Sequence, residues 1–175
     1  MEIISYVLEG ELAHKDSMGN GSVIRPGDVQ RMSAGTGITH SEFNPLTKSK
    51  ANFLQIWLLP TAKRIRPGYE QRHFAPDDRQ GRFKLLVSPD GRGESISANS
   101  DALIYGALLD EGQSVGHGIN PDRTAYVHVA RGTVEIDAHE LKAGDGATLG
   151  TGSNIQIAGR DKSEVLLFDL PLNHH

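Results

Sequence analysis

The chain has 175 residues, a length that suits one large or two small domains. It contains no cysteine, which excludes disulfides, zinc–thiolate sites and thiol nucleophiles. The net charge is −4 with interspersed signs, and no apolar run approaches the ~20 residues of a membrane helix, so we expect a cytoplasmic protein with neither nucleic acid nor membrane as a partner.

Short strands dominate the predicted secondary structure. They are rich in β-branched and apolar residues, and Gly, Pro, Asn or Asp bounds most of them. In chain order we predict strands at residues 3–12, 29–33, 53–59, 84–87, 103–109, 125–129, 133–137 and 164–170. The best helical candidate, residues 99–109, is interrupted by Tyr105-Gly106. The sequence therefore predicts an all-β fold.

The segment from Ser33 to Pro45 carries a candidate site. Gly35 and Gly37 predict a tight turn, because glycine tolerates positive φ. A short extended run follows, in which His40 and Glu42 are two residues apart and so point the same way. An imidazole and a carboxylate are half of a four-ligand metal site. The alternative is a chance pair on a solvated strand, since two ligands do not hold a catalytic metal.

The chain also contains an internal repeat. Val-Leu-Glu-Gly at 7–10 is echoed by Val-Ala-Arg-Gly at 129–132, and Gly-Asp at 27–28 by Gly-Asp at 144–145. A closing apolar strand at 53–57 is echoed at 165–168. Three items in the same order favour duplication. We predict domains at residues 1–75 and 76–175, with a linker within 60–82.

The same offset tests the second copy for a metal pair. It carries His40 onto Ile157 and Glu42 onto Gly159, neither of which is a ligand. We therefore expect the second copy to be structural, and any chemistry to belong to the first.

Residues 7–12, 14–20 and 25–30, together with the His40 segment, closely resemble the first cupin domain of the pirin family. The likeness is nearest to bacterial pirin-like proteins with quercetin 2,3-dioxygenase activity. It is specific from Met1 to about Trp57 and weaker to Leu170. It implies two tandem cupin domains, each a jelly-roll barrel. It also implies a divalent transition metal, Fe(II) first and Mn, Ni or Cu as alternatives, held by three His and one Glu, with His40 and Glu42 as the last two ligands.

The chain departs from this pattern at its start. In the family the other two ligands form a His-x-His pair, which would fall just before Glu2. We interpret the sequence as an N-terminally truncated pirin whose first cupin domain is incomplete. Such a barrel has an unpaired edge, so we expect a homo-oligomer formed through that edge.

The resemblance implies a flavonol substrate that binds through its 3-hydroxyl oxygen. Glu42 is the expected catalytic residue, because a carboxylate beside a cation can orient or accept that proton. Loss of the His-x-His ligands predicts impaired activity. The alternative is a non-catalytic pirin-like protein that acts through protein contacts.

Four further residues need an interpretation. Glu2 is either at a ligand position of other cupins or a frayed terminal carboxylate. His14 is expected in a surface turn. Gln55 and Trp57 alternate with Ile56, so one of the two faces reaches the pocket, unless Trp57 is simply core.

Overall fold

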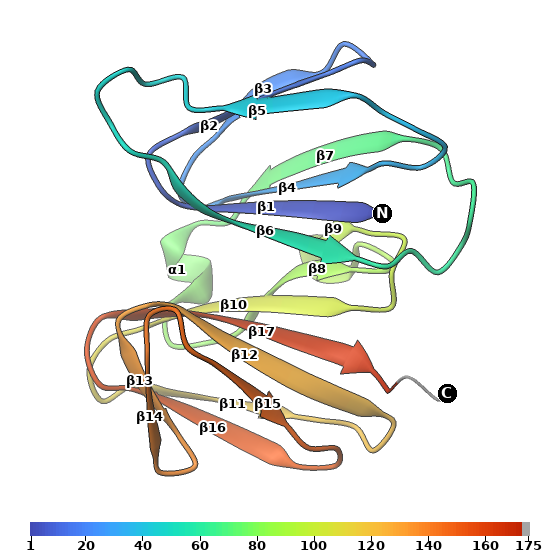
Figure 1. Ribbon diagram of the computed structural model, residues 1–175. Helices are drawn as coiled ribbons and strands as arrows, with labels where there is room; N and C mark the ends of the chain where they lie inside the picture. The colour runs from blue at the N-terminus through green and yellow to red at the C-terminus, as the bar shows by residue number, and fades with distance from the viewer. Residues whose placement is uncertain (173–175) are drawn as a thin grey trace. The chain divides into compact units, whose positions relative to one another are not determined.

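The computed structural model describes residues 1–172 and is built almost wholly from strands (Figure 1). The strands of the first half are β1 (Glu2–Glu9), β2 (Leu12–Asp16), β3 (Gly21–Ile24), β4 (Asp28–Ser33), β5 (His40–Phe43), β6 (Asn52–Leu58), β7 (Gly68–His73), β8 (Lys84–Ser88) and β9 (Ile96–Ser97). Those of the second half are β10 (Leu103–Leu109), β11 (Ser114–Gly118), β12 (Arg123–Arg131), β13 (Thr133–Ile136), β14 (His139–Lys142), β15 (Gly146–Leu149), β16 (Asn154–Gly159) and β17 (Ser163–Pro171). The helical turns are α1 (Pro76–Arg79) and the 3-10 turn η1 (Arg92–Glu94).

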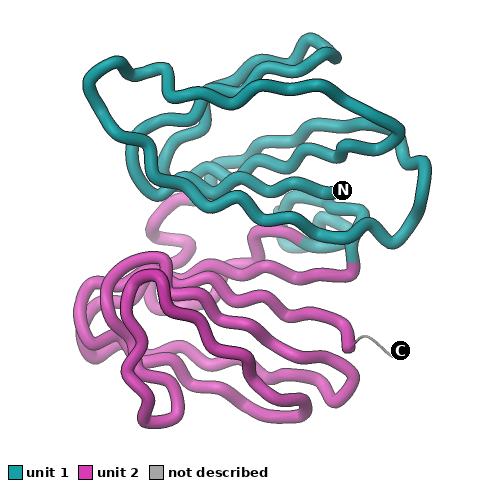
Figure 2. Tube along the Cα trace, viewed as in Figure 1, with its two compact units in different colours: residues 1–74, 88–100 teal, residues 75–87, 101–175 magenta. Residues whose placement is uncertain are grey.

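The chain divides into two compact units, shown in separate colours in Figure 2. Unit 1 contains residues 1–74 and 88–100, and unit 2 contains residues 75–87 and 101 onward. The chain thus passes between the units three times, whereas the sequence suggests a single boundary after residue 75. The described residues contain no helix with the length and apolar character needed to cross a membrane.

Unit 1 is built from two sheets whose strands follow the orders β6-β1-β4-β7 and β3-β2-β5. The predicted linker is wrong in part, because β7 is a full edge strand that pairs with β4 along six residues. The predicted strand 3–12 is also wrong. The chain turns at Gly10, where φ is +74°, and the two arms become β1 and β2.

Unit 2 has an interior filled with aliphatic side chains. Its strands follow the orders β15-β12-β17-β10-β8 in one sheet and β11-β16-β13-β14 in the other. Alternate residues of β12 point inward, and Ala125, Val127 and Val129 are fully buried. Val165 and Leu167 of β17 complete this part of the core.

The two units repeat one skeleton. The order β6-β1-β4 in unit 1 recurs as β17-β12-β15 in unit 2. The central strand even carries a bulge at the same place, between Val7 and Glu9 in β1 and between Val129 and Arg131 in β12. A bulge is a specific local feature, so its recurrence at equivalent residues agrees with the predicted duplication.

The turn before the third repeated strand is also the same. Gly27 and Gly144 both have φ of +94°, a conformation that glycine adopts without strain. The following carboxylates, Asp28 and Asp145, each accept a hydrogen bond from the backbone N–H three residues earlier, at 2.9 and 2.8 Å. This capping explains why Gly-Asp was a visible repeat.

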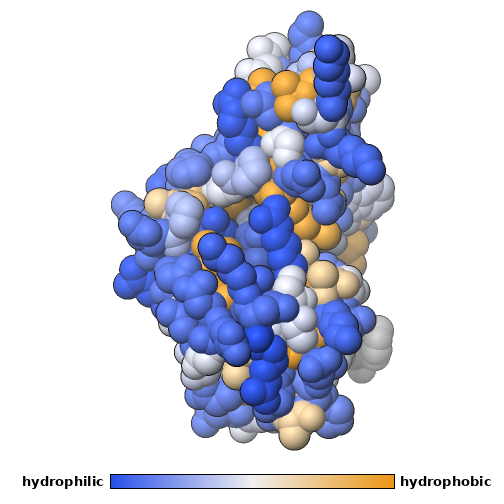
Figure 3. Space-filling model, turned by 90° about the vertical axis from the view of Figure 1, so that its left-hand side faces the viewer, coloured by the Kyte–Doolittle hydropathy of each residue, from blue (hydrophilic) through white to orange (hydrophobic). Residues whose placement is uncertain are grey.

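Exposed large hydrophobic side chains are few among the described residues, and Trp57 and Leu59 are the most exposed at 63% and 78%. Trp57 lies near the end of β6, and Leu59 directly follows that strand. On the face drawn in Figure 3, hydrophilic residues predominate and hydrophobic ones form small separate patches.

The packed core of unit 2 yields a stability prediction. Leu167→Ala removes a fully buried side chain from this cluster and should lower the free energy of unfolding by about 2–5 kcal/mol. Urea denaturation measures the change. The control is Gln156→Ala on the exposed face of β16, which should have little effect. Equal effects of the two variants would contradict the assignment of this core.

Candidate metal centre

The pairing of β2 with β5 creates a polar cluster inside unit 1. In this antiparallel pair, His14 lies opposite Glu42 and Asp16 lies opposite His40. Residues directly opposite share a face, as do residues two apart on one strand. All four side chains therefore point to the same side of the sheet.

The turn that contains Gly35 and Gly37 precedes β5 and places His40 at the start of this strand. Gly35 and Gly37 have φ of +52° and +140°, which confirms the predicted turn. A Cβ on Gly35 would lie 2.4 Å from the carbonyl oxygen of Ile65, so the chain passes too closely for any side chain. The N–H of Gly37 donates to the carbonyl of Ala34 at 2.9 Å and closes the turn.

Three side chains form the metal-type cluster. His14, His40 and Glu42 each offer one ligand atom, and these atoms lie within 4.8 Å of one another. The structure thus brings His40 and Glu42 together as the sequence suggested, and it adds His14. The expectation that His14 is a surface residue is wrong, because it lies within β2 and is only 2% exposed.

Asp16 orients the His14 ring. Its Oδ2 lies 3.3 Å from His14 Nε2, while its Oδ1 accepts the backbone N–H groups of Met18 and Asn20 at 2.9 and 3.0 Å. Desolvation acts to raise the pKa of Asp16, but the hydrogen bonds from Asn20, His14 and Met18 outweigh it and lower that pKa. A carboxylate that holds one imidazole nitrogen leaves the other to face a cation. Here Nδ1 faces Glu42, whose Oε1 is 3.9 Å away.

The cluster fits a divalent transition metal. His40 Nδ1 is buried and has no hydrogen-bond partner among the described residues, and the same holds for Gln30 Oε1 nearby. Gln30 Nε2 lies 3.3 Å from His14 Nδ1, which places this amide beside the cluster. Buried polar atoms normally have partners, so orphaned ones suggest a missing ligand. Two imidazoles and one carboxylate suit iron and similar metals, with positions left open.

Glu42 is held by neighbours on two strands of the opposite sheet. Ser5 Oγ donates to its Oε1 at 3.2 Å, and Gln55 Nε2 donates to its Oε2 at 2.7 Å. The Gln55 face of β6 is therefore the one that reaches the site. Trp57 shares this face and is largely exposed, so the core interpretation of Trp57 is wrong.

Tyr69 forms another side of the cluster. Its ring centroid lies 5.1 Å from that of His14. Its hydroxyl is hydrogen-bonded to Ser22 Oγ and donates to Gln71 Oε1 at 2.8 Å. Burial raises the pKa of Tyr69, and the negative charges of Asp16, Asp28 and Glu42 raise it further, against the hydrogen bond with Ser22. Tyr69 thus stays a neutral donor.

Glu2 is not part of this cluster. It is three residues before Ser5 on β1, so its side chain points to the opposite face. Its Oε2 accepts hydrogen bonds from Ser33 Oγ at 2.9 Å and from the backbone of Asn99 at 3.1 Å. The carboxylate is fully buried, so the frayed-terminus interpretation is wrong as well.

Unit 2 has no equivalent cluster in the described residues. Ile157, which the repeat aligned with His40, is a fully buried core residue. The polar groups at one end of this interior pair with each other: Asp169 is hydrogen-bonded to His117 Nε2 at 2.9 Å and also to Arg123. These side chains bind one another, and no set of three convergent metal ligands forms around them in the described part of unit 2.

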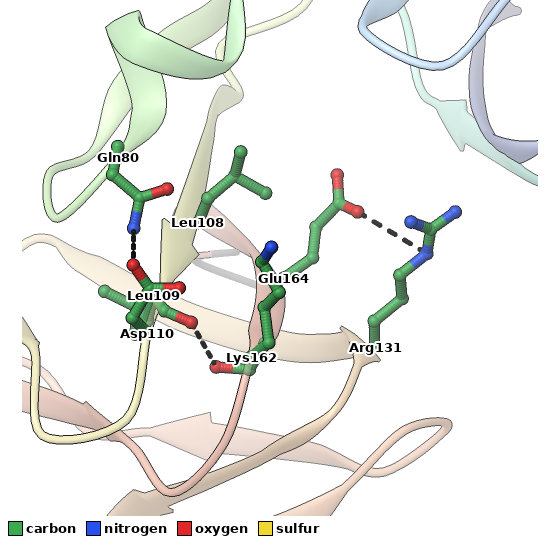
Figure 4. Close-up of a pocket in the computed structure, with 8 residues that line it drawn as sticks. Gln80, Leu108, Leu109, Asp110, Arg131, Lys162 and Glu164 are labelled. Atoms are coloured by element: carbon green, nitrogen blue, oxygen red, sulfur yellow. Dashed lines mark hydrogen bonds and ion pairs between the residues drawn. The ribbon is translucent and has the colours of Figure 1, made fainter.

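Unit 2 does contain a surface pocket of 240 Å³ (Figure 4). Gln80 and Arg131 stand on opposite sides of it, with Lys162 and Glu164 between them. Its polar groups mostly satisfy one another, since Gln80 Nε2 donates to Asp110 at 3.2 Å and Arg131 Nε lies 3.7 Å from Glu164. All of its lining residues belong to unit 2, so this pocket is separate from the His14–His40–Glu42 cluster.

Comparison with known proteins agrees with this architecture. Residues 1–58 match the family model described as Pirin, and residues 85–170 match the model of the quercetinase C-terminal cupin domain. The quercetin 2,3-dioxygenase of Escherichia coli K12 is 44% identical over 172 residues, which are 98% of this chain and 73% of that protein. A pirin-like protein of Caulobacter vibrioides is 35% identical over 170 residues, 97% of this chain and 73% of that protein.

Solved structures show the same fold. YhhW from Escherichia coli superposes with a TM-score of 0.92 and 40% identity, covering 99% of this chain and 73% of that one. The nickel(II) complex of this bacterial pirin gives a TM-score of 0.90 and 41% identity, covering 98% and 72%. The chain therefore belongs to the pirin family, and the predicted all-β fold of two tandem cupin domains is confirmed.

The raised pKa of Tyr69 gives a pH prediction. The folded protein holds the phenol proton more tightly than the unfolded chain, so this stabilisation is complete below pH ~10 and is lost as pH rises through the folded pKa. The free energy of unfolding should therefore fall above pH ~10, and less steeply in Tyr69→Phe. Urea denaturation across alkaline pH measures both slopes, with Tyr126→Phe as the control. Parallel slopes for wild type and Tyr69→Phe would count against this pKa.

Proposed function

We propose that unit 1 binds a divalent transition metal through His14, His40 and Glu42 and acts as a flavonol 2,3-dioxygenase. The observation that carries the proposal is the convergence of two imidazoles and a carboxylate in a partly buried interior. The names of the relatives supply the reaction, since similar proteins are called quercetin 2,3-dioxygenase and one is solved with nickel(II). Fe(II) is our first choice of metal, with Mn, Ni and Cu as alternatives.

Each residue of the site has a distinct task in this proposal. His14 and His40 supply neutral nitrogen ligands, and Asp16 keeps the His14 ring in one orientation. Glu42 is the negatively charged group, and it accepts or orients the proton of the flavonol 3-hydroxyl. Tyr69 packs against the His14 ring and limits its movement. The metal, when bound, would supply charge stabilisation and bring the reactants together.

A metal titration tests the ligand set. Calorimetry with Ni(II) or Fe(II) under anaerobic conditions should show one site per chain. His14→Ala and His40→Ala should each weaken binding at least about 10-fold, since even outer-sphere partners act on that scale. His139→Ala, which removes an exposed imidazole of unit 2, is the control. Binding that survives the loss of both His14 and His40 would place the metal elsewhere.

A turnover assay tests the reaction. The metal-loaded chain should consume quercetin and dioxygen, and Glu42→Gln should lower kcat/KM by roughly 100-fold or more through loss of acid–base assistance. Glu140→Gln on the exposed face of unit 2 should leave the rate unchanged. If the loaded wild type shows no turnover while it binds metal, the second proposal becomes the better one: a non-catalytic pirin that acts through protein contacts.

A further inference from the structure

The carboxylate of Glu42 is the end of a series of hydrogen bonds that begins at the largely exposed side chain of Trp57. Trp57 Nε1 donates to Gln55 Oε1 at 3.1 Å, and Gln55 Nε2 donates to Glu42 Oε2 at 2.7 Å. The second contact is short, as expected for a donor to an ionised carboxylate. The three side chains come from β5 and β6, which belong to different sheets of unit 1.

The donor and acceptor groups at the two ends fix the direction of both hydrogen bonds. An indole N–H can only donate, and an ionised carboxylate can only accept. The Gln55 amide must therefore turn its oxygen to Trp57 and its nitrogen to Glu42. The amide is locked at both ends, which fixes a side chain that is otherwise exposed and costly to order.

The other oxygen of Glu42 is fixed from a neighbouring strand. Ser5 donates to Oε1, and Ser5 and Gln55 lie directly opposite each other in the β1–β6 pair. Each carboxylate oxygen accepts one of these bonds and has two lone pairs. One lone pair on each oxygen thus stays available, and rotation of the carboxylate would break both bonds.

We propose that Gln55 is a positioning residue that fixes the Glu42 carboxylate toward His14 and His40, and that Trp57 anchors Gln55 in this role. The inference rests on the proposed metal site for its functional meaning. Hydrogen-bond partners of ligating carboxylates set ligand orientation and metal affinity in this way. Trp57 is also the single tryptophan of the chain, so its indole reports on this site alone.

The first test needs no metal. In a ¹H–¹⁵N spectrum of the metal-free protein, Trp57 gives the single indole cross-peak. Glu42→Gln should displace this peak, because it changes the acceptor at the end of the chain. Gln55→Met keeps the length of the side chain but removes both hydrogen bonds. When Glu42→Gln is added to a protein that already carries Gln55→Met, it should no longer displace the peak. A peak that does not respond to Glu42→Gln, or that responds equally in both backgrounds, would overturn the connection.

The second test measures metal affinity. Gln55→Met should weaken Ni(II) binding about 10- to 100-fold, the range for lost outer-sphere partners. Trp57→Phe keeps a ring but removes the N–H, and it should weaken binding in the same direction by a smaller factor. The control is Asn52→Met, which removes an exposed amide from the same strand and should leave affinity unchanged. Unchanged affinity in Gln55→Met would refute the positioning role.

The two tests separate this inference from the proposed function. If the wild-type chain bound no metal, the ligand assignment would fail, yet the indole experiment would still show whether Gln55 couples Trp57 to Glu42. If the wild type bound metal through His14 and His40 and Gln55→Met bound it equally well, the metal site would stand and the positioning role would fall.

Discussion

The register between β2 and β5 is the constraint on which the candidate site depends. It sets His14 opposite Glu42 and Asp16 opposite His40, so four polar side chains share one face. A slip of one residue by either strand would turn that strand's two polar side chains to the other side of the sheet and separate them from the other pair. The glycine turn before β5 and the Asp16-capped turn after β2 lie at the same end of the ladder, where Asp16 pairs with His40, and they hold the register there because each fixes where its strand begins or stops pairing.

The two units share one arrangement of strands, but the side chains inside them differ in polarity. In unit 2 the inward positions of β12 and β17 are aliphatic, and the barrel is a packed core. In unit 1 one apolar cluster is formed by Val7, Leu12 and Ile24 with Phe53 against it, and the unit also buries the polar residues Ser5, His14 and Gln30. Buried polar groups of this kind are tolerated only when hydrogen bonds satisfy them. The network around His14 and Glu42 meets this requirement except at a few atoms, which are the ones a ligand would complete.

The network around His14 and Glu42 has a central group of side chains and a second group that surrounds it. The potential ligands lie at the centre, and Asp16, Ser5, Gln55 and Tyr69 surround them from four strands. Three of these surrounding residues have a further attachment: Asp16 caps a turn, Gln55 is held by the Trp57 indole, and Tyr69 is hydrogen-bonded to Ser22 and Gln71. A group fixed at both ends loses little freedom when a cation arrives, and preorganisation of this kind is what binding and catalysis require.

The sequence by itself determined the features that depend on near neighbours. The strand period predicted that His40 and Glu42 point together, the glycines predicted the turn before them, and the repeated Gly-Asp and strand motifs predicted two copies of one fold. The tertiary structure alone decided which distant residues join them. His14 was missed because its role depends on the pairing of β2 with β5. Gln55 was named, but the sequence left open which face of its strand reaches the site, because that depends on two sheets facing each other. The spacing of residues along a strand can be read from the local sequence. The register between strands and the packing of one sheet against another depend on the whole unit, so only the folded chain shows them.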